Sequence, residues 1–161
     1  MADATRLDRF AAKLASVRRL AWNDRWLLLQ ATLLMPVLRL SLRALSFRRI
    51  YSVLRRLAPL SDPLPTEPET APARVLQVAY VVAMASRHTP TPNSCLHRSL
   101  ALWWLLRRRG FASHLRFGAR RQQSGFEAHA WVEHNGVVVF DNLVPDGDYV
   151  RLSWQPLEHD A

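Results

Sequence analysis

The sequence lacks most of the residues on which disulfide-rich and metal-binding domains are built. Its 161 residues include one cysteine, Cys95, which excludes a disulfide framework and any multi-cysteine metal site within a single chain. It has one lysine, Lys13, and five glycines, and neither a glycine-rich phosphate loop nor a paired-histidine metal motif occurs. We therefore expect no metal ion, nucleotide or other cofactor.

Long hydrophobic runs are also missing. The longest, Trp26 to Leu38, is shorter than the roughly 18–20 residues that a membrane span needs, and it contains Pro36. Acidic residues at positions 3 and 8 stand where the basic region of a secretory signal would lie. The sequence therefore predicts a cytoplasmic chain without an integral membrane span.

Charge is the strongest compositional bias. Lys and Arg number 22 against 13 for Asp and Glu, and the formal net charge of +9 favours acidic or anionic partners. The arginines occur in short groups flanked by leucines, as on the polar faces of amphipathic helices: Arg18-Arg19, Arg48-Arg49, Arg55-Arg56 and Arg107-Arg108-Arg109. No nucleic-acid-binding motif accompanies them, so nucleic acid is not an expected partner.

Three regions differ in composition. Residues 1–58 contain no glycine and repeat apolar residues at helical spacing, and Pro36 is expected to end or kink one of the helices. Five prolines within residues 59–72 predict an extended linker. Residues 73–161 begin with helical patterns and change to a period of two after Phe111. We expect an α+β fold, in which a helical N-terminal region packs on a domain with one buried helix against a small antiparallel sheet.

Cys95 begins the most apolar of the predicted helices. Ser94 is suited to cap this helix, and Gly110 to end it after Arg109. The unpaired N–H groups of a first helical turn carry a partial positive charge that stabilises a thiolate. Free cysteine is also among the most buried residue types, and position alone slightly favours a structural thiol. His97 faces another side of the helix and is interpreted as a surface or packing residue.

His129 is the candidate base that a cysteine nucleophile requires. It lies in the alternating segment 127–134, where His129 and Trp131 project to one face of a strand and the neighbouring alanines to the other. Asp141 follows the apolar run 137–140 and is the candidate for orienting the imidazole.

Two hairpin registers decide whether His129 meets Asp141. A two-residue turn at positions 135–136 turns Asp141 to the face opposite His129 and leaves Asn142 as the candidate for orienting the imidazole. A three-residue loop, in which only the glycine is left-handed, pairs Glu133 with Val137. It sets Asp141 across from His129, with Cβ atoms about 4.5–5.5 Å apart. We predict the three-residue loop, because it permits Cys-His-Asp chemistry.

Two blocks of the sequence resemble a known family. Residues 95–100 read Cys-Leu-x-Arg-Ser-Leu, and residues 128–133 read Ala-His-Ala-Trp-Val-Glu. Together they look like the leader peptidase of lasso-peptide biosynthesis, which is the C-terminal half of the B protein and often a separate chain. That enzyme is a papain-like cysteine protease of the transglutaminase-like superfamily, and the likeness extends over residues 74–142.

The resemblance implies a catalytic triad and a pathway. By it, Cys95 is the nucleophile, His129 the general base and Asp141 the residue that orients the base. The implied reaction is removal of the leader peptide from a ribosomally made precursor in antibiotic biosynthesis, through an acyl-enzyme. The implied partners are the precursor peptide, a small leader-recognition companion protein and the ATP-dependent lasso macrolactam synthetase.

Two alternatives stay open. A transglutaminase-type acyl transferase would use the same triad with an amine as acceptor. A non-catalytic helical adaptor would dock its basic face on an acidic partner or a membrane surface.

Overall fold

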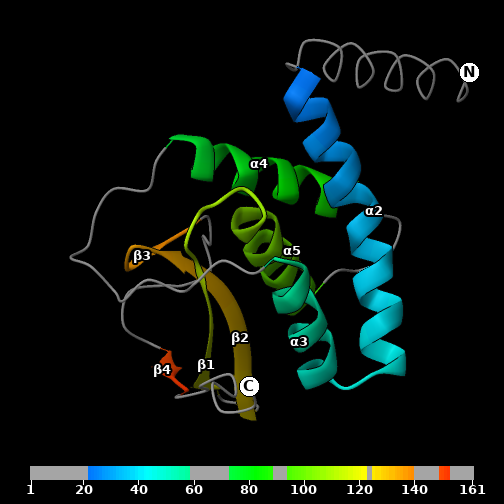
Figure 1. Cartoon of the computed structure of the whole chain (residues 1–161). Coiled ribbons are helices and arrows are strands. Elements are labelled where there is room, and N and C mark those ends of the chain that lie inside the picture. Colours follow the sequence, from blue (N-terminus) through cyan, green and yellow to red (C-terminus); the bar gives the residue numbers. More distant parts are fainter. Residues whose placement is uncertain (1–21, 59–72, 89–93, 123–124, 140–148, 153–161) are drawn as a thin grey trace, which may run out of the picture.

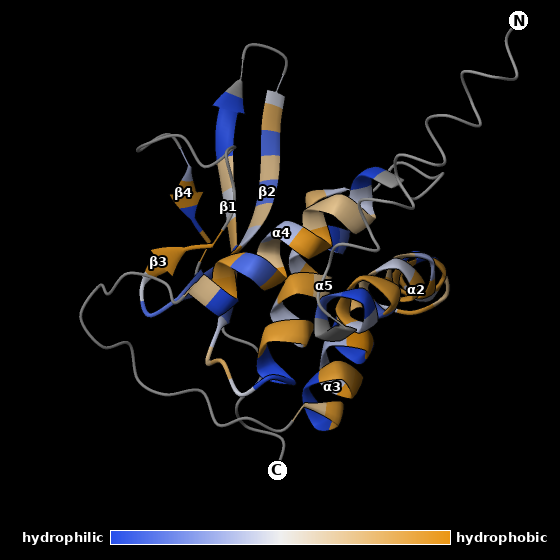
Figure 2. Ribbon diagram, turned by 90° about the horizontal axis from the view of Figure 1, so that it is seen from above, coloured by the Kyte–Doolittle hydropathy of each residue, from blue (hydrophilic) through white to orange (hydrophobic). Residues whose placement is uncertain are grey.

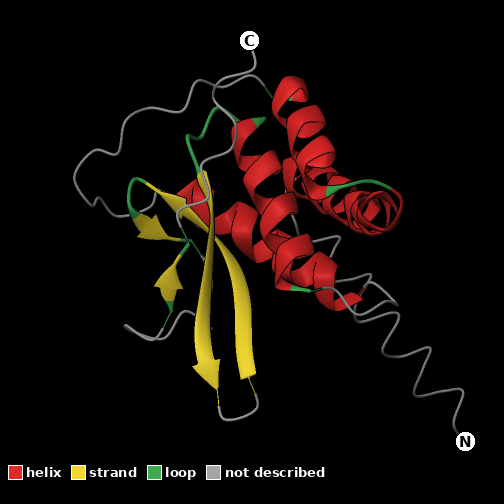
Figure 3. Cartoon of the chain, turned by 90° about the horizontal axis from the view of Figure 1, so that it is seen from below, coloured by secondary structure: helices red, strands yellow, loops and turns green. Residues whose placement is uncertain are grey.

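The computed structural model describes residues 22–58, 73–88, 94–122, 125–139 and 149–152. Within these ranges, four helices cover one face of an antiparallel sheet of four strands (Figure 1). The helices are α2 (Trp22–Ala44), α3 (Phe47–Leu57), α4 (Ala73–His88) and α5 (Cys95–Arg107). The strands, in spatial order, are β3 (Val137–Val138), β2 (Gly125–His134), β1 (His114–Gln122) and β4 (Val150–Arg151). The α+β prediction is confirmed, and the helical and sheet layers are separate in Figure 3.

Helix α5 forms the centre of the molecule, because its sequence is apolar on nearly every side. It begins at Cys95 as predicted and ends two residues before the predicted Arg109. Gly110, with φ of 81°, provides the left-handed residue that stops it. The hydroxyl of Ser99 donates a hydrogen bond of 2.7 Å to the carbonyl of Ala130, which joins the helix to β2.

Helix α2 continues past Pro36, from Trp22 to Ala44, so the expectation that the proline could end a helix is wrong. Pro36 itself is exposed, whereas Met35 and Leu38 lie in the core shared with α4 and α5. Burial of two such side chains contributes about 1.5–3 kcal/mol each, which offsets the cost of about 3 kcal/mol for a proline inside a helix.

The continuity of α2 changes one further expectation. By length and composition alone, the helical segment Asp24–Ala44 is long and apolar enough to cross a membrane. The uninterrupted apolar runs of the sequence were too short to suggest this. One side of the same helix, however, packs in the hydrophobic core of this chain, and core helices also pass that test.

The described part of the N-terminal region shares one core with the rest of the chain, as predicted. Tyr51 of α3 stacks on Trp103 of α5 with ring centroids 4.6 Å apart. The guanidinium of Arg107 lies 5.3 Å from the centre of the Trp103 ring, and its Nε donates a hydrogen bond of 3.2 Å to the carbonyl of Ala58. Residues 59–72, the predicted linker, lie outside the described residues.

The hairpin between β2 and β3 has the two-residue turn, so the prediction of a three-residue loop is wrong. His134 pairs with Val137, and both residues of the turn Asn135-Gly136 are left-handed, with φ of 49° and 76°. A turn of this type matches the right-handed twist of the strands, and asparagine tolerates left-handed backbone better than most residues. The geometric argument that set Asp141 opposite His129 therefore fails, and Asp141 itself lies outside the described residues.

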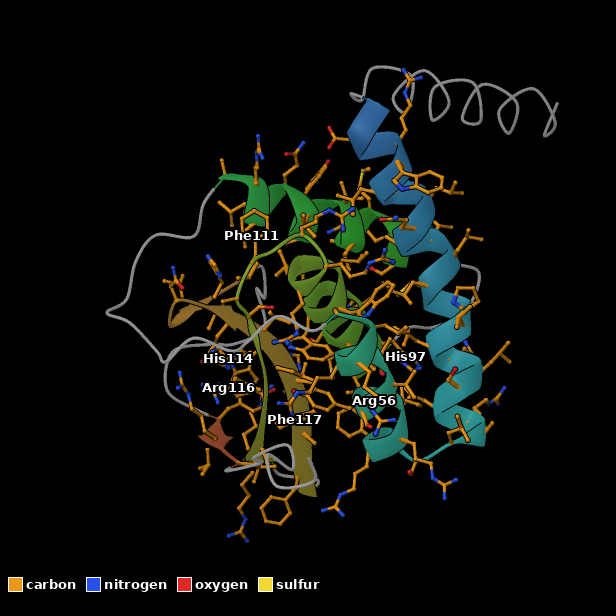
Figure 4. The ribbon with its side chains drawn as sticks, in the orientation of Figure 1. Arg56, His97, Phe111, His114, Arg116 and Phe117 are labelled. Carbon is orange, nitrogen blue, oxygen red and sulfur yellow. The ribbon has the colours of Figure 1, made fainter. Side chains whose placement is uncertain are left out.

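The two faces of the β1–β2 ladder have different surroundings. One face packs on the helices, which gather on one side of these strands in Figure 2. Phe117 belongs to this face and meets Phe47 of α3 edge to face at 5.5 Å. Arg116, the preceding residue, points away from α3 (Figure 4). Paired residues on neighbouring strands share a face. The register therefore places three β2 residues on the same face as Arg116: His129, Trp131 and Glu133.

Candidate active site

Cys95 occupies the first position of α5, directly after the N-cap residue Ser94. Its thiol is free and partly buried. The first turn of α5 contains no acidic residue, so no carboxylate there opposes formation of a thiolate at the positive end of the helix.

His97 caps the helix that carries Cys95, a role that the sequence interpretation missed. The backbone N–H of Ser94 donates to Nδ1 of His97 at 3.3 Å, and the Ser94 hydroxyl lies 2.6 Å from the same nitrogen. Burial, and secondly the charge of Arg39, lowers the pKa of His97, which leaves Nδ1 free to accept. The available signal was its position three residues after a serine N-cap, where Glu or Gln completes a capping box.

His129 lies within β2 and is 6% exposed. The imidazole stacks on Trp131 with ring centroids 6.3 Å apart and an interplanar angle of 17°, which confirms that the two residues share a face. A second ring, that of Tyr149, lies 5.5 Å from it with a tilt of 39°. The sequence interpretation did not identify Tyr149 as a site residue.

Tyr149 is held by a charged pair on the same face of the sheet. The Glu127 carboxylate accepts a hydrogen bond from the Tyr149 hydroxyl and another, of 2.6 Å, from Nε of Arg120. The guanidinium of Arg120 also lies 4.8 Å from the centre of the Tyr149 ring. The hydrogen bond from Arg120 lowers the pKa of Glu127, whereas burial and then the bond to Glu127 raise the pKa of Tyr149. At neutral pH, a neutral phenol therefore donates to a carboxylate.

Cys95 also acts on Tyr149 through its charge. After burial and the bond to Glu127, this charge is the smallest contribution that raises the pKa of the phenol. The ring contact of 5.5 Å places Tyr149 against His129, which is 34 positions after Cys95 in the sequence. The third predicted residue, Asp141, lies outside the described residues, so its role remains a prediction.

A buried carboxylate anchors Trp131, the other ring against His129. The indole Nε1 of Trp131 donates a hydrogen bond of 3.0 Å to Glu133, which is 2% exposed. Arg116 of β1 and Arg151 of β4 each form an ion pair of 3.0 Å with the same carboxylate. The burial of this negative charge is compensated by these three donors.

A hollow lies beside α5, on the side of the helix that carries Cys95. Arg98 and Leu102, which follow Cys95 by three and seven residues, line it together with apolar residues of α4, with Trp131 and Val132 of β2, and with Val139. Within the described ranges, no group of three or more His, Cys, Asp or Glu side chains could hold a metal ion. The chemistry that this arrangement supports is covalent acyl transfer by a thiol and an imidazole from separate elements.

Comparison with protein families agrees with this chemistry. Residues 34–153 match the family described as the transglutaminase-like superfamily, which includes cysteine peptidases and acyltransferases. The matched range includes Cys95, His129 and Asp141. No curated protein and no solved structure matches the sequence. Since the match covers most of the chain, from within α2 to beyond β4, this protein belongs to the transglutaminase-like superfamily.

Proposed function

We propose that this protein is a cytoplasmic cysteine peptidase that removes the leader peptide from a ribosomally made lasso-peptide precursor. The observation that carries the proposal is the combination of a partly buried cysteine at the start of α5 with a buried histidine of β2 whose ring contacts Trp131 and Tyr149. Membership of the transglutaminase-like superfamily supports acyl-enzyme chemistry. The leader-peptidase assignment rests on the resemblance of the two sequence blocks around Cys95 and His129.

The proposed reaction proceeds through a thioester. The Cys95 thiolate attacks the carbonyl carbon of the scissile amide, and His129 gives its proton to the amine of the core peptide as the C–N bond breaks. Water then attacks the thioester, His129 takes a proton from it, and the leader leaves with a new carboxylate while the thiol is restored. Asp141 orients the imidazole in this scheme, a role that rests on the resemblance and not on the register of the hairpin. The amine that cleavage frees on the core peptide is the substrate of the ATP-dependent macrolactam synthetase.

The test is cleavage of the full precursor peptide, followed by mass spectrometry. Cys95→Ala and His129→Ala should each abolish cleavage, because a nucleophile and its base act as a unit. His114→Ala, at a histidine on β1 outside the proposed triad, is the matched control and should retain activity. Cleavage by Cys95→Ala would contradict the proposal.

Two further readouts separate the alternatives. Added methylamine should leave the leader with a free carboxylate in a peptidase, whereas a leader methylamide would indicate an acyl transferase. Slow alkylation of Cys95 by iodoacetamide at neutral pH, together with no cleavage, would indicate the helical adaptor.

We also propose that the leader-recognition companion protein docks on the outer face of α2. Large apolar side chains recur along this face at helical spacing, and all are exposed: Trp26, Leu29, Leu33, Val37 and Leu40. Residues 22–58 contain seven arginines and one acidic residue, Asp24. An apolar ridge with an acidic rim on the companion would complement this surface.

The companion should act by tethering. A leader peptide bound to it as an added strand is held at a high effective concentration near Cys95. Initial cleavage rates at low precursor concentration should therefore rise when the companion is present. Leu33→Glu should remove this stimulation and leave the rate of the chain alone unchanged, whereas Leu76→Glu, at an exposed leucine of α4, is the control. Equal rates with and without the companion would contradict the proposal.

A further inference from the structure

The edge strand β4 is short, yet several contacts fix its position. Its residues Val150 and Arg151 pair with β1, and the N–H of Leu152 donates a hydrogen bond of 2.9 Å to the carbonyl of Phe117 (Figure 1). The ion pair of Arg151 with the buried Glu133 adds a side-chain contact across the sheet. Tyr149, directly before β4, is thereby held above the face that carries His129.

Gly118 leaves the space that Tyr149 requires. This glycine is the β1 partner of His129, so a side chain at position 118 would project from the same face. A Cβ atom there would lie 2.9 Å from ring atoms of Trp131 and 3.2 Å from Cβ of Tyr149. The absence of a side chain at position 118 therefore allows both rings to lie against the imidazole.

The contacts of Tyr149 contribute more to geometry than to stability. Val150 is 72% exposed, so β4 buries little apolar surface. The Arg120–Glu127 pair is partly exposed on both sides, and pairs of this kind add little to the free energy of folding. The pair nevertheless fixes the Tyr149 side chain, because Glu127 binds its hydroxyl and Arg120 lies over its ring. The centroid of this ring lies 5.5 Å from that of His129.

We infer that Tyr149 is a positioning residue, which keeps the His129 imidazole in the orientation needed for proton exchange with Cys95. Glu127 and Arg120 act through Tyr149, by holding its hydroxyl and its ring. The inference rests on the proposed function of His129 as the general base. Aromatic contacts of this geometry shift a side-chain equilibrium by about threefold to tenfold, which sets the size of the expected effect.

The test uses iodoacetamide, because alkylation of Cys95 reports on the thiol and its base without a peptide substrate. Rates are measured between about pH 5 and 9, the range in which imidazole and thiol groups titrate. Tyr149→Leu should slow alkylation at neutral pH by about threefold to tenfold and move the rate profile to higher pH. Tyr149→Phe keeps the ring but loses the bond to Glu127, so its effect should be smaller, and Glu127→Gln should resemble it. Tyr80→Leu, at a tyrosine of α4 that is 54% exposed, is the matched control and should leave the profile unchanged.

The His129→Ala background separates this inference from the proposed function. If His129→Ala leaves the alkylation profile unchanged, Cys95 does not depend on His129 and the proposed function fails. If His129→Ala changes the profile and Tyr149→Leu does not, only the positioning role of Tyr149 is overturned. In the double variant, loss of Tyr149 should have no further effect on the profile.

A merely structural role would give a different result. Destabilised protein would contain less reactive Cys95, but the folded fraction would keep its pH profile, and that outcome would overturn the inference. With precursor peptide, Tyr149→Leu should lower kcat by about threefold to tenfold and leave KM unchanged, since the contact acts on the base and not on substrate binding.

Discussion

Replacement of Gly118 by alanine measures how closely the rings around His129 are packed. The backbone of Gly118 does not have the positive φ that would demand glycine, so the effect of the added methyl group is steric. The new Cβ would lie 2.9 Å from Cη2 and Cζ3 of Trp131. Trp131 is 2% exposed and tied to Glu133 through its indole N–H, so its ring cannot swing away cheaply.

The expected magnitude follows from two opposing effects. Overpacking a buried site costs about 1–3 kcal/mol, whereas alanine in a strand is about 0.5–1 kcal/mol more favourable than glycine. Gly118→Ala should therefore lower the free energy of unfolding by up to about 2.5 kcal/mol. The displaced Tyr149 ring should also slow alkylation of Cys95.

A double-mutant cycle with Trp131→Phe tests the cause. Phenylalanine lacks Cη2 and Cζ3, the indole atoms that crowd position 118. The change itself also costs stability, because the hydrogen bond from the indole to Glu133 is lost. In this background the overpacking should be relieved and Gly118→Ala should become neutral or slightly stabilising, which is a coupling of about 1–3 kcal/mol. The measurement is urea unfolding of the four proteins, followed by far-ultraviolet circular dichroism. The same cost of Gly118→Ala in both backgrounds would refute the steric explanation.

Three other predictions concern the helix cap, the orienting residue and the core. Burial lowers the pKa of His97, so the unfolded chain binds its proton more readily and stability should fall as the pH drops below 6.5. His97→Gln, which can still cap, should show a smaller drop in Tm between about pH 7.5 and 5.5, and an equal drop would contradict this role. Asp141→Asn should leave only a trace of cleavage and Asn142→Ala should stay near wild type; the reverse result would assign the orienting role to Asn142. Met35→Ala, at a fully buried side chain of α2, should cost about 2–5 kcal/mol in urea unfolding, and Leu33→Ala, at an exposed position of the same helix, less than about 0.5 kcal/mol.

Short-range signals in the sequence were enough to place the candidate nucleophile and base on their elements. A serine N-cap before an apolar helical pattern predicted that α5 begins at Cys95, and the structure confirms it. The alternation of residues 127–134 predicted that His129 and Trp131 share a face, which their stacked rings confirm. Both features depend on the period of one element and on its cap, and these are properties of a few neighbouring residues.

Features that depend on competition between distant segments were not predictable in this way. The turn at Asn135-Gly136 could be read in two registers that differ by one residue, and the preferred chemistry selected the wrong one. Pro36 was expected to end or kink a helix, but burial of the residues around it in a core built with α4 and α5 keeps α2 continuous.

The sequence by itself determined the fold class, the position of Cys95 at a helix start and the face on which His129 lies, because caps and periodicity act locally. Only the tertiary structure decided that β4 returns to the edge of the sheet and places Tyr149 against the ring of His129. That placement depends on the space left by Gly118 and on the pairing of Arg151 with Glu133. Such contacts join residues far apart in the chain, and no local pattern encodes them.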